Sequence, residues 1–113
     1  MKLKLVIGPD AEADIKTAAN WYHSQQAGLG EDFLADMYDA LQRASYNPRH
    51  FPRVRTRPEV RRTLLDRFPY RIFFVLYPKR VFVFRVLHSS RHDREWKSAV
   101  PKPWHTPQVP PGI

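Results

Sequence analysis

The first residues of the chain alternate polar and apolar side chains, which is the pattern of a half-buried strand. Leu3, Leu5 and Ile7 occupy the apolar positions, and Lys2 and Lys4 precede the first two of them. Successive side chains of a strand point to opposite faces. Pro9 follows directly and suits the first turn of a helix. We therefore predict a short strand at residues 2–7, with a helix beginning after it.

Residues 10–46 carry apolar side chains at spacings of three and four, the period of amphipathic helices. The first stripe consists of Ala11, Ile15, Ala18 and Tyr22, and the second of Phe33, Met37, Leu41 and Ala44, widened by Leu34 and Tyr38. The Gly28-Leu29-Gly30 sequence interrupts the pattern between them. We expect an antiparallel helical hairpin whose second helix covers residues 31–46.

Three short apolar segments rich in β-branched and aromatic residues follow, at residues 60–65, 71–77 and 81–88. A turn at residues 78–80 joins the last two, which predicts an antiparallel meander, and residues 49–58 before it are expected to form a loop. The last two segments are apolar on both faces, so both faces must be covered. We expect the helices to cover one face, and the loop or the C-terminal segment to cover part of the other. The core is predicted to contain the aromatic side chains of Phe73, Phe74, Phe82 and Phe84.

Proline dominates the end of the chain, where Pro101, Pro103, Pro107, Pro110 and Pro111 exclude regular helix or sheet. We predict a disordered, Pro-rich tail at residues 100–113 and a single domain at residues 1–99. The fold class is α+β: an N-terminal strand, a helical hairpin and a three-stranded meander.

Charge is divided unevenly between the two halves of the chain. Residues 1–47 hold 4 Lys or Arg and 7 Asp or Glu, a net charge of −3, whereas residues 48–113 hold 15 and 4, a net charge of +11, giving the total of +8. A sign change of this kind predicts one basic face that binds nucleic acid or an acidic protein segment. There are no cysteines, and neither a secretory signal nor a membrane span is evident, so we expect a cytoplasmic protein without a membrane partner.

Three local motifs, in this order and spacing, give the chain a resemblance to a known family. They are Ala11-x-x-Asp14-Ile15 followed by Trp21-Tyr22, then Arg62 with Arg67-Phe68-Pro69-Tyr70-Arg71-Ile72, and finally Val86-Leu87-His88-Ser89-Ser90-Arg91. With the predicted element order, the chain resembles the RelE/ParE superfamily of toxins from bacterial type II toxin-antitoxin systems. The likeness extends from about Leu3 to Trp96.

The resemblance implies a growth-inhibiting toxin, of the kind that stabilises plasmids, which is neutralised by a cognate antitoxin. RelE-like members cleave messenger RNA on the ribosome, whereas ParE-like members inhibit DNA gyrase without known cleavage chemistry. The long hairpin, together with Ser89 and Ser90 where nucleases carry an aromatic or basic group, favours the ParE-like branch. A RelE-like ribosome-dependent endoribonuclease stays open as an alternative, and so does a non-catalytic RNA-binding module.

If the protein is a ribonuclease, His88 is the candidate acid or base, and Arg71 and Arg62 would stabilise the phosphate. Strand alternation nevertheless places His88 and Arg85 on opposite faces of the sheet unless a bulge intervenes. The residues expected to bind target or antitoxin are Arg53, Arg55, Arg61, Arg85 and Arg91. His88 and His92 have no evident third ligand, so neither a metal site nor a cofactor is expected.

Overall fold

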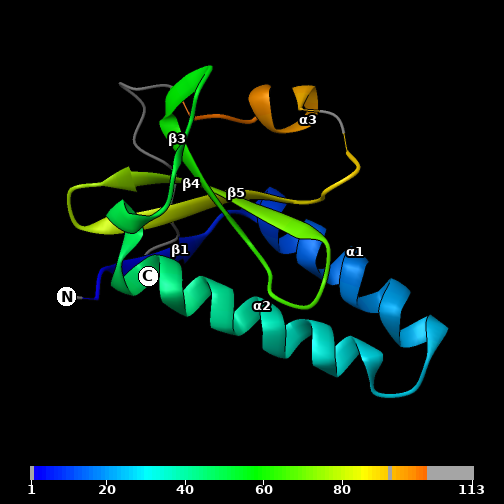
Figure 1. Ribbon diagram of the computed structural model, residues 1–113. Helices are drawn as coiled ribbons and strands as arrows, with labels where there is room; N and C mark the ends of the chain where they lie inside the picture. Colours follow the sequence, from blue (N-terminus) through cyan, green and yellow to red (C-terminus); the bar gives the residue numbers. More distant parts are fainter. Residues whose placement is uncertain (1, 92, 102–113) are drawn as a thin grey trace.

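A mixed five-stranded sheet with a helical hairpin on one face forms the molecule, in a computed structural model that describes residues 2–91 and 93–101 (Figure 1). The elements, in chain order, are β1 (Lys4–Ile7), α1 (Pro9–Gln25), α2 (Leu29–Tyr46), the 3₁₀ helix η1 (Pro48–His50), β2 (Arg53–Val54), β3 (Arg57–Leu64), β4 (Tyr70–Tyr77), β5 (Arg80–His88) and α3 (Arg94–Lys97). The strands lie in the order β1-β5-β4-β3-β2. The α+β class and the predicted order of elements are confirmed.

The predicted meander is confirmed, because β4 pairs antiparallel with both β3 and β5. Two features differ from the predictions. The first strand lies parallel to β5, opposite residues 80–83, so the sheet is mixed. The predicted loop at residues 49–58 instead contains η1, β2 and the start of β3. Pro58 is tolerated in β3 because it is paired in neither ladder: β2 pairs with Arg57 and Arg61, and the pairs with β4 begin at Val60.

The hairpin turns more tightly than the glycines predict. α1 ends at Gln25 and α2 begins at Leu29, two residues before the predicted start. Gly28 adopts φ 84° at the turn, a conformation that glycine reaches without strain. Gly30 lies inside α2, where a Cβ atom would meet the His23 ring at 2.3 Å. This second glycine therefore allows the two helices to approach closely, and the prediction that it belongs to the connection before the second helix was wrong.

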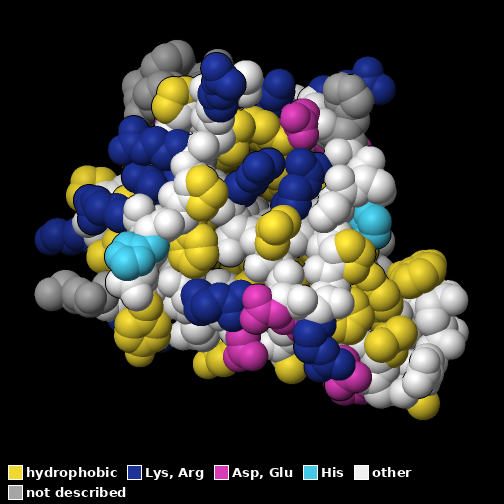
Figure 2. Space-filling view, in the orientation of Figure 1, with side chains coloured by type: hydrophobic (Ala, Val, Ile, Leu, Met, Phe, Trp, Pro, Cys, Tyr) yellow, Lys and Arg dark blue, Asp and Glu magenta, His cyan; other side chains and the backbone are white. Residues whose placement is uncertain are grey.

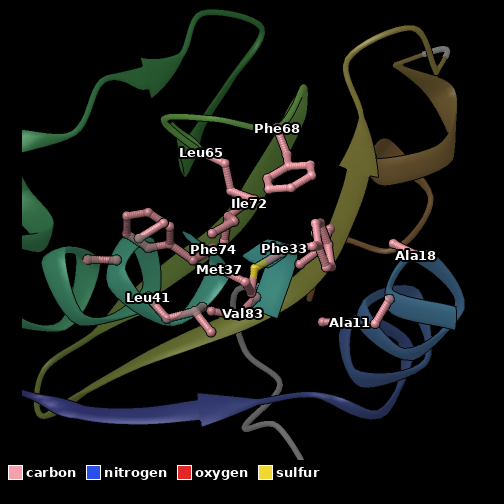
Figure 3. Packing of buried hydrophobic residues seen from close by; sticks show 14 of the residues in the cluster. Ala11, Ala18, Phe33, Met37, Leu41, Leu65, Phe68, Ile72, Phe74 and Val83 are labelled. Carbon is pink, nitrogen blue, oxygen red and sulfur yellow. The ribbon is translucent and has the colours of Figure 1, made fainter. Parts of the chain in front are cut away.

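The sheet has two apolar faces. The helix face, which includes Ile72, Phe74 and Val83, packs against Phe33 and Met37 of α2 and against α1 (Figure 3). All four phenylalanines predicted for the core are buried. Leu34 and Tyr38 are 41% and 62% exposed, so the predicted widening of the α2 stripe was wrong; they line a shallow apolar depression between α1 and α2, beside Ile15.

The opposite face, called here the outer face, includes Val60, Arg62, Phe73 and Leu87. Trp96 of α3 covers part of it, with its ring stacked on that of Phe73 at 5.0 Å. The expected cover by a C-terminal segment is therefore confirmed. The predicted tail falls almost entirely on residues 102–113, which lie outside the described residues. Within the described part of the chain, no helix has the length and apolar character that crossing a membrane requires.

A buried carboxylate of α2 fixes the turn between β3 and β4. Asp36 is 6% exposed, and its side chain accepts hydrogen bonds from the backbone N–H groups of Asp66, Arg67 and Phe68, at 3.3, 2.8 and 3.1 Å. A carboxylate can accept several such bonds at once, and bonds to a charged acceptor are the stronger kind. This turn consequently has its backbone donors satisfied by the hairpin.

The substitution Asp36→Asn should lower the free energy of unfolding by about 2–3 kcal/mol, because the amide group has one acceptor oxygen where the carboxylate has two. Urea unfolding followed by circular dichroism measures the change. Asp39→Asn is the matched control, since Asp39 is exposed on the same helix. Equal stability of the two variants would show that the Asp36 bonds contribute little.

Candidate functional site

The arginines near the sheet fall into two groups, according to whether a carboxylate pairs with them. Arg71, Arg85 and Arg91 each pair with one, whereas Arg53, Arg55, Arg61 and Arg62 form no ion pair within residues 2–91 and 93–101. The arginines that the sequence suggested as binding or catalytic residues therefore include both ion-paired and unpaired side chains. The paired group serves the fold directly, as the following contacts show.

Arg85 joins β5 to both helices that flank it. Its guanidinium donates from Nε and Nη2 to the two carboxylate oxygens of Asp14, at 2.7 and 3.0 Å, and from Nη1 to the carbonyl of Glu95 at 3.1 Å. The Asp14 carboxylate also accepts the Val86 N–H at 2.9 Å. The hydrogen bond to Asp14 raises the pKa of Arg85 further above its ordinary value. This guanidinium is therefore engaged in structural contacts.

Arg71 and Arg91 hold the segment between β5 and α3. Arg71 is 8% exposed and donates to the Asp93 carboxylate at 3.2 Å and to the carbonyl of Arg91 at 2.9 Å. Arg91 donates from Nε to the Glu95 carboxylate at 2.7 Å. The hydrogen bond that Arg71 donates to Asp93 lowers the pKa of the Asp93 carboxyl below its ordinary value. Both arginines hold α3 in place over the outer face.

His88 lies on the other side of the sheet from Arg71 and Arg85, whereas Arg91 lines the same cleft as His88. It is paired with Tyr70 across the β4–β5 ladder, and the two rings meet edge to face at 5.2 Å. Arg85 is paired with Phe73 on the outer face. A β-bulge at Phe84 interrupts the ladder, but it precedes Arg85 and leaves the alternation from Arg85 to His88 intact. His88 and Arg85 thus face apart, as the alternation predicts.

The hydrogen bonds of His88 fix the form of its neutral ring. Nδ1 accepts the backbone N–H of Ser90 at 3.0 Å and lies 2.8 Å from the Ser90 hydroxyl oxygen. With Nδ1 as the acceptor, the proton of the neutral imidazole is on Nε2. Burial raises the pKa of the neighbouring Tyr70 to about 12. In this arrangement the neutral His88 side chain is a hydrogen-bond donor at Nε2, and Ser90 already occupies the lone pair of Nδ1.

The unpaired arginines gather at the edge of the sheet formed by β2 and β3. Arg61 is 9% exposed, and its Nη1 donates to the carbonyls of Arg49 and Phe51, at 3.4 and 2.9 Å. Figure 2 shows basic side chains clustered over this end of the molecule, while several acidic ones lie beside α2. Arg49 and Arg80 also form no ion pair in the described part of the chain. Neither of these two arginines was a sequence-based candidate.

The family model for the ParE toxin of the type II toxin-antitoxin system, parDE, matches residues 5–93, which is most of the chain. The chain belongs to the ParE toxin family. The predicted resemblance to the RelE/ParE superfamily is confirmed, and the ParE-like toxin assignment is favoured over a plain RNA-binding module. Membership of a type II toxin family implies a cognate antitoxin as the partner of this ParE-family toxin.

Solved structures share the fold of this ParE-family toxin. A chain of the chromosomal ParDE system from P. aeruginosa superposes with a TM-score of 0.64 at 20% identity, covering 77% of this chain and 96% of that one. A doubly substituted E. coli RelE toxin in the free state superposes with a TM-score of 0.54 at 18% identity, covering 88% and 95%. No curated protein sequence matches significantly. At these identities the likeness supports the fold alone.

Replacing Arg71 with methionine should return the pKa of Asp93 toward its ordinary value near 3.8, because the hydrogen bond from Arg71 is the main cause of its lowering. A carboxylate whose pKa is lowered by folding stabilises the protein above its unfolded pKa, and this contribution disappears as pH falls through the folded pKa. A carboxyl-carbon NMR titration measures the midpoint. Arg62→Met is the control, since Arg62 is exposed and the ion pair of Asp93 is with Arg71. An unchanged Asp93 midpoint in Arg71→Met would contradict this account.

Proposed function

We propose that this ParE-family toxin acts in the cytoplasm and inhibits DNA gyrase by protein contact, without cleaving RNA. The observation that carries the proposal is the separation of the candidate groups: His88 is on the helix face, whereas Arg62 and Arg71 belong to the outer face. Metal-free RNA cleavage needs a base, an acid and positive charge around one phosphate. Groups on opposite faces of a sheet do not surround one phosphate.

The bonding of these groups also favours binding over catalysis. Arg71 uses one terminal nitrogen on Asp93 and the other on the carbonyl of Arg91, so neither end is free to move onto a phosphate without breaking the β5–α3 connection. His88 has its Nδ1 occupied by Ser90. The catalytic roles first considered for His88, Arg71 and Arg62 are consequently not part of this proposal.

The exposed arginines without carboxylate partners are the proposed contacts with the target. Arg55 lies between β2 and β3, and Arg62 projects from the outer face of β3. An exposed guanidinium without an ion pair retains its full set of donors for an acidic surface. Arg85 and Arg91, which the sequence also suggested as contacts, are proposed to position α3 instead, because Asp14 and Glu95 already occupy them.

His88→Ala should leave both growth arrest and gyrase inhibition within about twofold of the wild type, since the ring takes part in no proposed step. Purified gyrase and relaxed plasmid give the supercoiling readout, and mapped messenger RNA ends on ribosomes give the cleavage readout. Transcripts cut by the wild type and spared by His88→Ala would establish the ribonuclease alternative. Intact transcripts with blocked supercoiling support the gyrase proposal.

Arg55→Ala and Arg62→Ala should each raise the concentration needed for half inhibition of supercoiling by about tenfold, the effect of losing one well-placed charged contact. Lys16→Ala removes one exposed positive charge from α1 and serves as the control. Should Lys16→Ala weaken inhibition equally, overall charge and not this surface would be the determinant.

A further inference from the structure

A basic pocket opens at the edge of the sheet where β2 and β3 meet the end of β4. It has a volume of about 510 Å³, and three arginines line it: Arg49, Arg53 and Arg61. Its remaining walls include Pro58, Glu59, Val75 and Pro78. The pocket is separate from the cleft beside His88, which is lined by residues of α1, β4 and β5.

Three positive charges meet in this pocket, and none of them pairs with a carboxylate of the described residues. Glu59 is the acidic residue of the lining, and its carboxylate is held by Arg57, at 3.2 Å from Nε and 3.1 Å from Nη2. Burial lowers the pKa of Arg61, and the charges of Arg53 and Arg49 lower it further. Desolvation and like-charge repulsion therefore both act on Arg61 in the free protein, and a bound anion would relieve the repulsion.

The innermost guanidinium is held in place before any ligand arrives. Nη1 of Arg61 is anchored on the carbonyls of Arg49 and Phe51, and the side chain is nine-tenths buried. Arg49 and Arg53, by contrast, are exposed at the mouth. A fixed donor at the base with mobile donors at the rim suits one entering oxyanion, because little side-chain entropy is lost at the base.

We propose that this pocket receives a carboxylate side chain of the antitoxin, an acidic residue that projects from a segment lying along the β2–β3 edge. This inference rests on the toxin function, because only a toxin has an antitoxin to bind. The shape of the pocket favours a carboxylate over a nucleic-acid phosphate. A glutamate or aspartate projects from its backbone into a recess, and Val75, Pro58 and Pro78 offer apolar walls for its methylene groups. A phosphate is part of a continuous backbone, which follows open grooves and surfaces.

The test measures binding of a capped octapeptide of alternating serine and glutamate to the full chain at low salt. Arg49→Gln and Arg53→Gln should each weaken binding about tenfold, since each removes a charge-assisted contact. Both residues are exposed, and thermal melting confirms that the variants fold. Lys16→Gln, which loses the same charge on α1, should change affinity less than twofold. In the wild type, the NMR signal of the Arg61 Nε–H group should shift on peptide addition.

Four results would overturn the proposal. Equal weakening by Lys16→Gln would mean that diffuse charge attracts the ligand. Equal binding of an uncharged control peptide of alternating serine and glutamine would mean that the carboxylates do not contribute to binding. An unchanged Arg61 signal in the presence of bound peptide would place the peptide elsewhere. The fourth result has two parts: the wild type binds an oligouridine but not the peptide, and the pocket variants lose the oligouridine. That result would identify the pocket as a nucleic-acid site. Growth arrest by the wild type tests the toxin function separately, so either idea can fail alone.

Discussion

The carboxylate of Asp14 takes the place that β1 leaves empty beside β5. β1 ends at Ile7, opposite Val83, so the rest of β5 has no strand neighbour on that side. Asp14 accepts the Val86 N–H in place of a ladder partner and pairs with Arg85, which reaches across to α3. The pair of Asp14 and Arg85 thus connects α1 of the hairpin, the edge strand segment of β5 and α3 on the outer face. An uncompensated charge here would be costly, because both side chains are largely buried.

Local patterns were sufficient to predict most of the elements. The stripes of Phe33 and Met37 and the alternation in β4 and β5 reflect periods that the sequence displays directly. The parallel pairing of β1 with β5 was not predicted, because the sequence of a four-residue strand does not indicate which strand it pairs with. The arginines were harder still: Arg85 finds Asp14 across 71 residues of sequence, so only the folded chain reveals which guanidinium groups have partners and which do not.

The uneven charge of the two halves acquires a structural explanation from these pairs. Acidic residues of the hairpin are engaged within the chain: Asp14 pairs with Arg85, Asp32 pairs with Arg67 at the surface, and Asp36 accepts hydrogen bonds from the backbone of a turn. The hairpin therefore neutralises the middle of the basic half and leaves the β2–β3 edge uncompensated. Under the proposed roles of Arg55, Arg62 and the basic pocket, target and antitoxin would compete for neighbouring arginines.

The bulge at Phe84 determines which register β5 can adopt. A regular ladder continuing from the pair of Phe74 and Val83 would turn Arg85 inward and bring His88 to the side of Arg71. In that alternative, a guanidinium would enter the apolar layer beneath α1 and α2 and lose Asp14, at a cost of several kcal/mol. The observed register of β5 against β4 is therefore more stable than a register shifted by one residue. A sheet with histidine and arginine side by side would consequently require changes in the core as well as in the site.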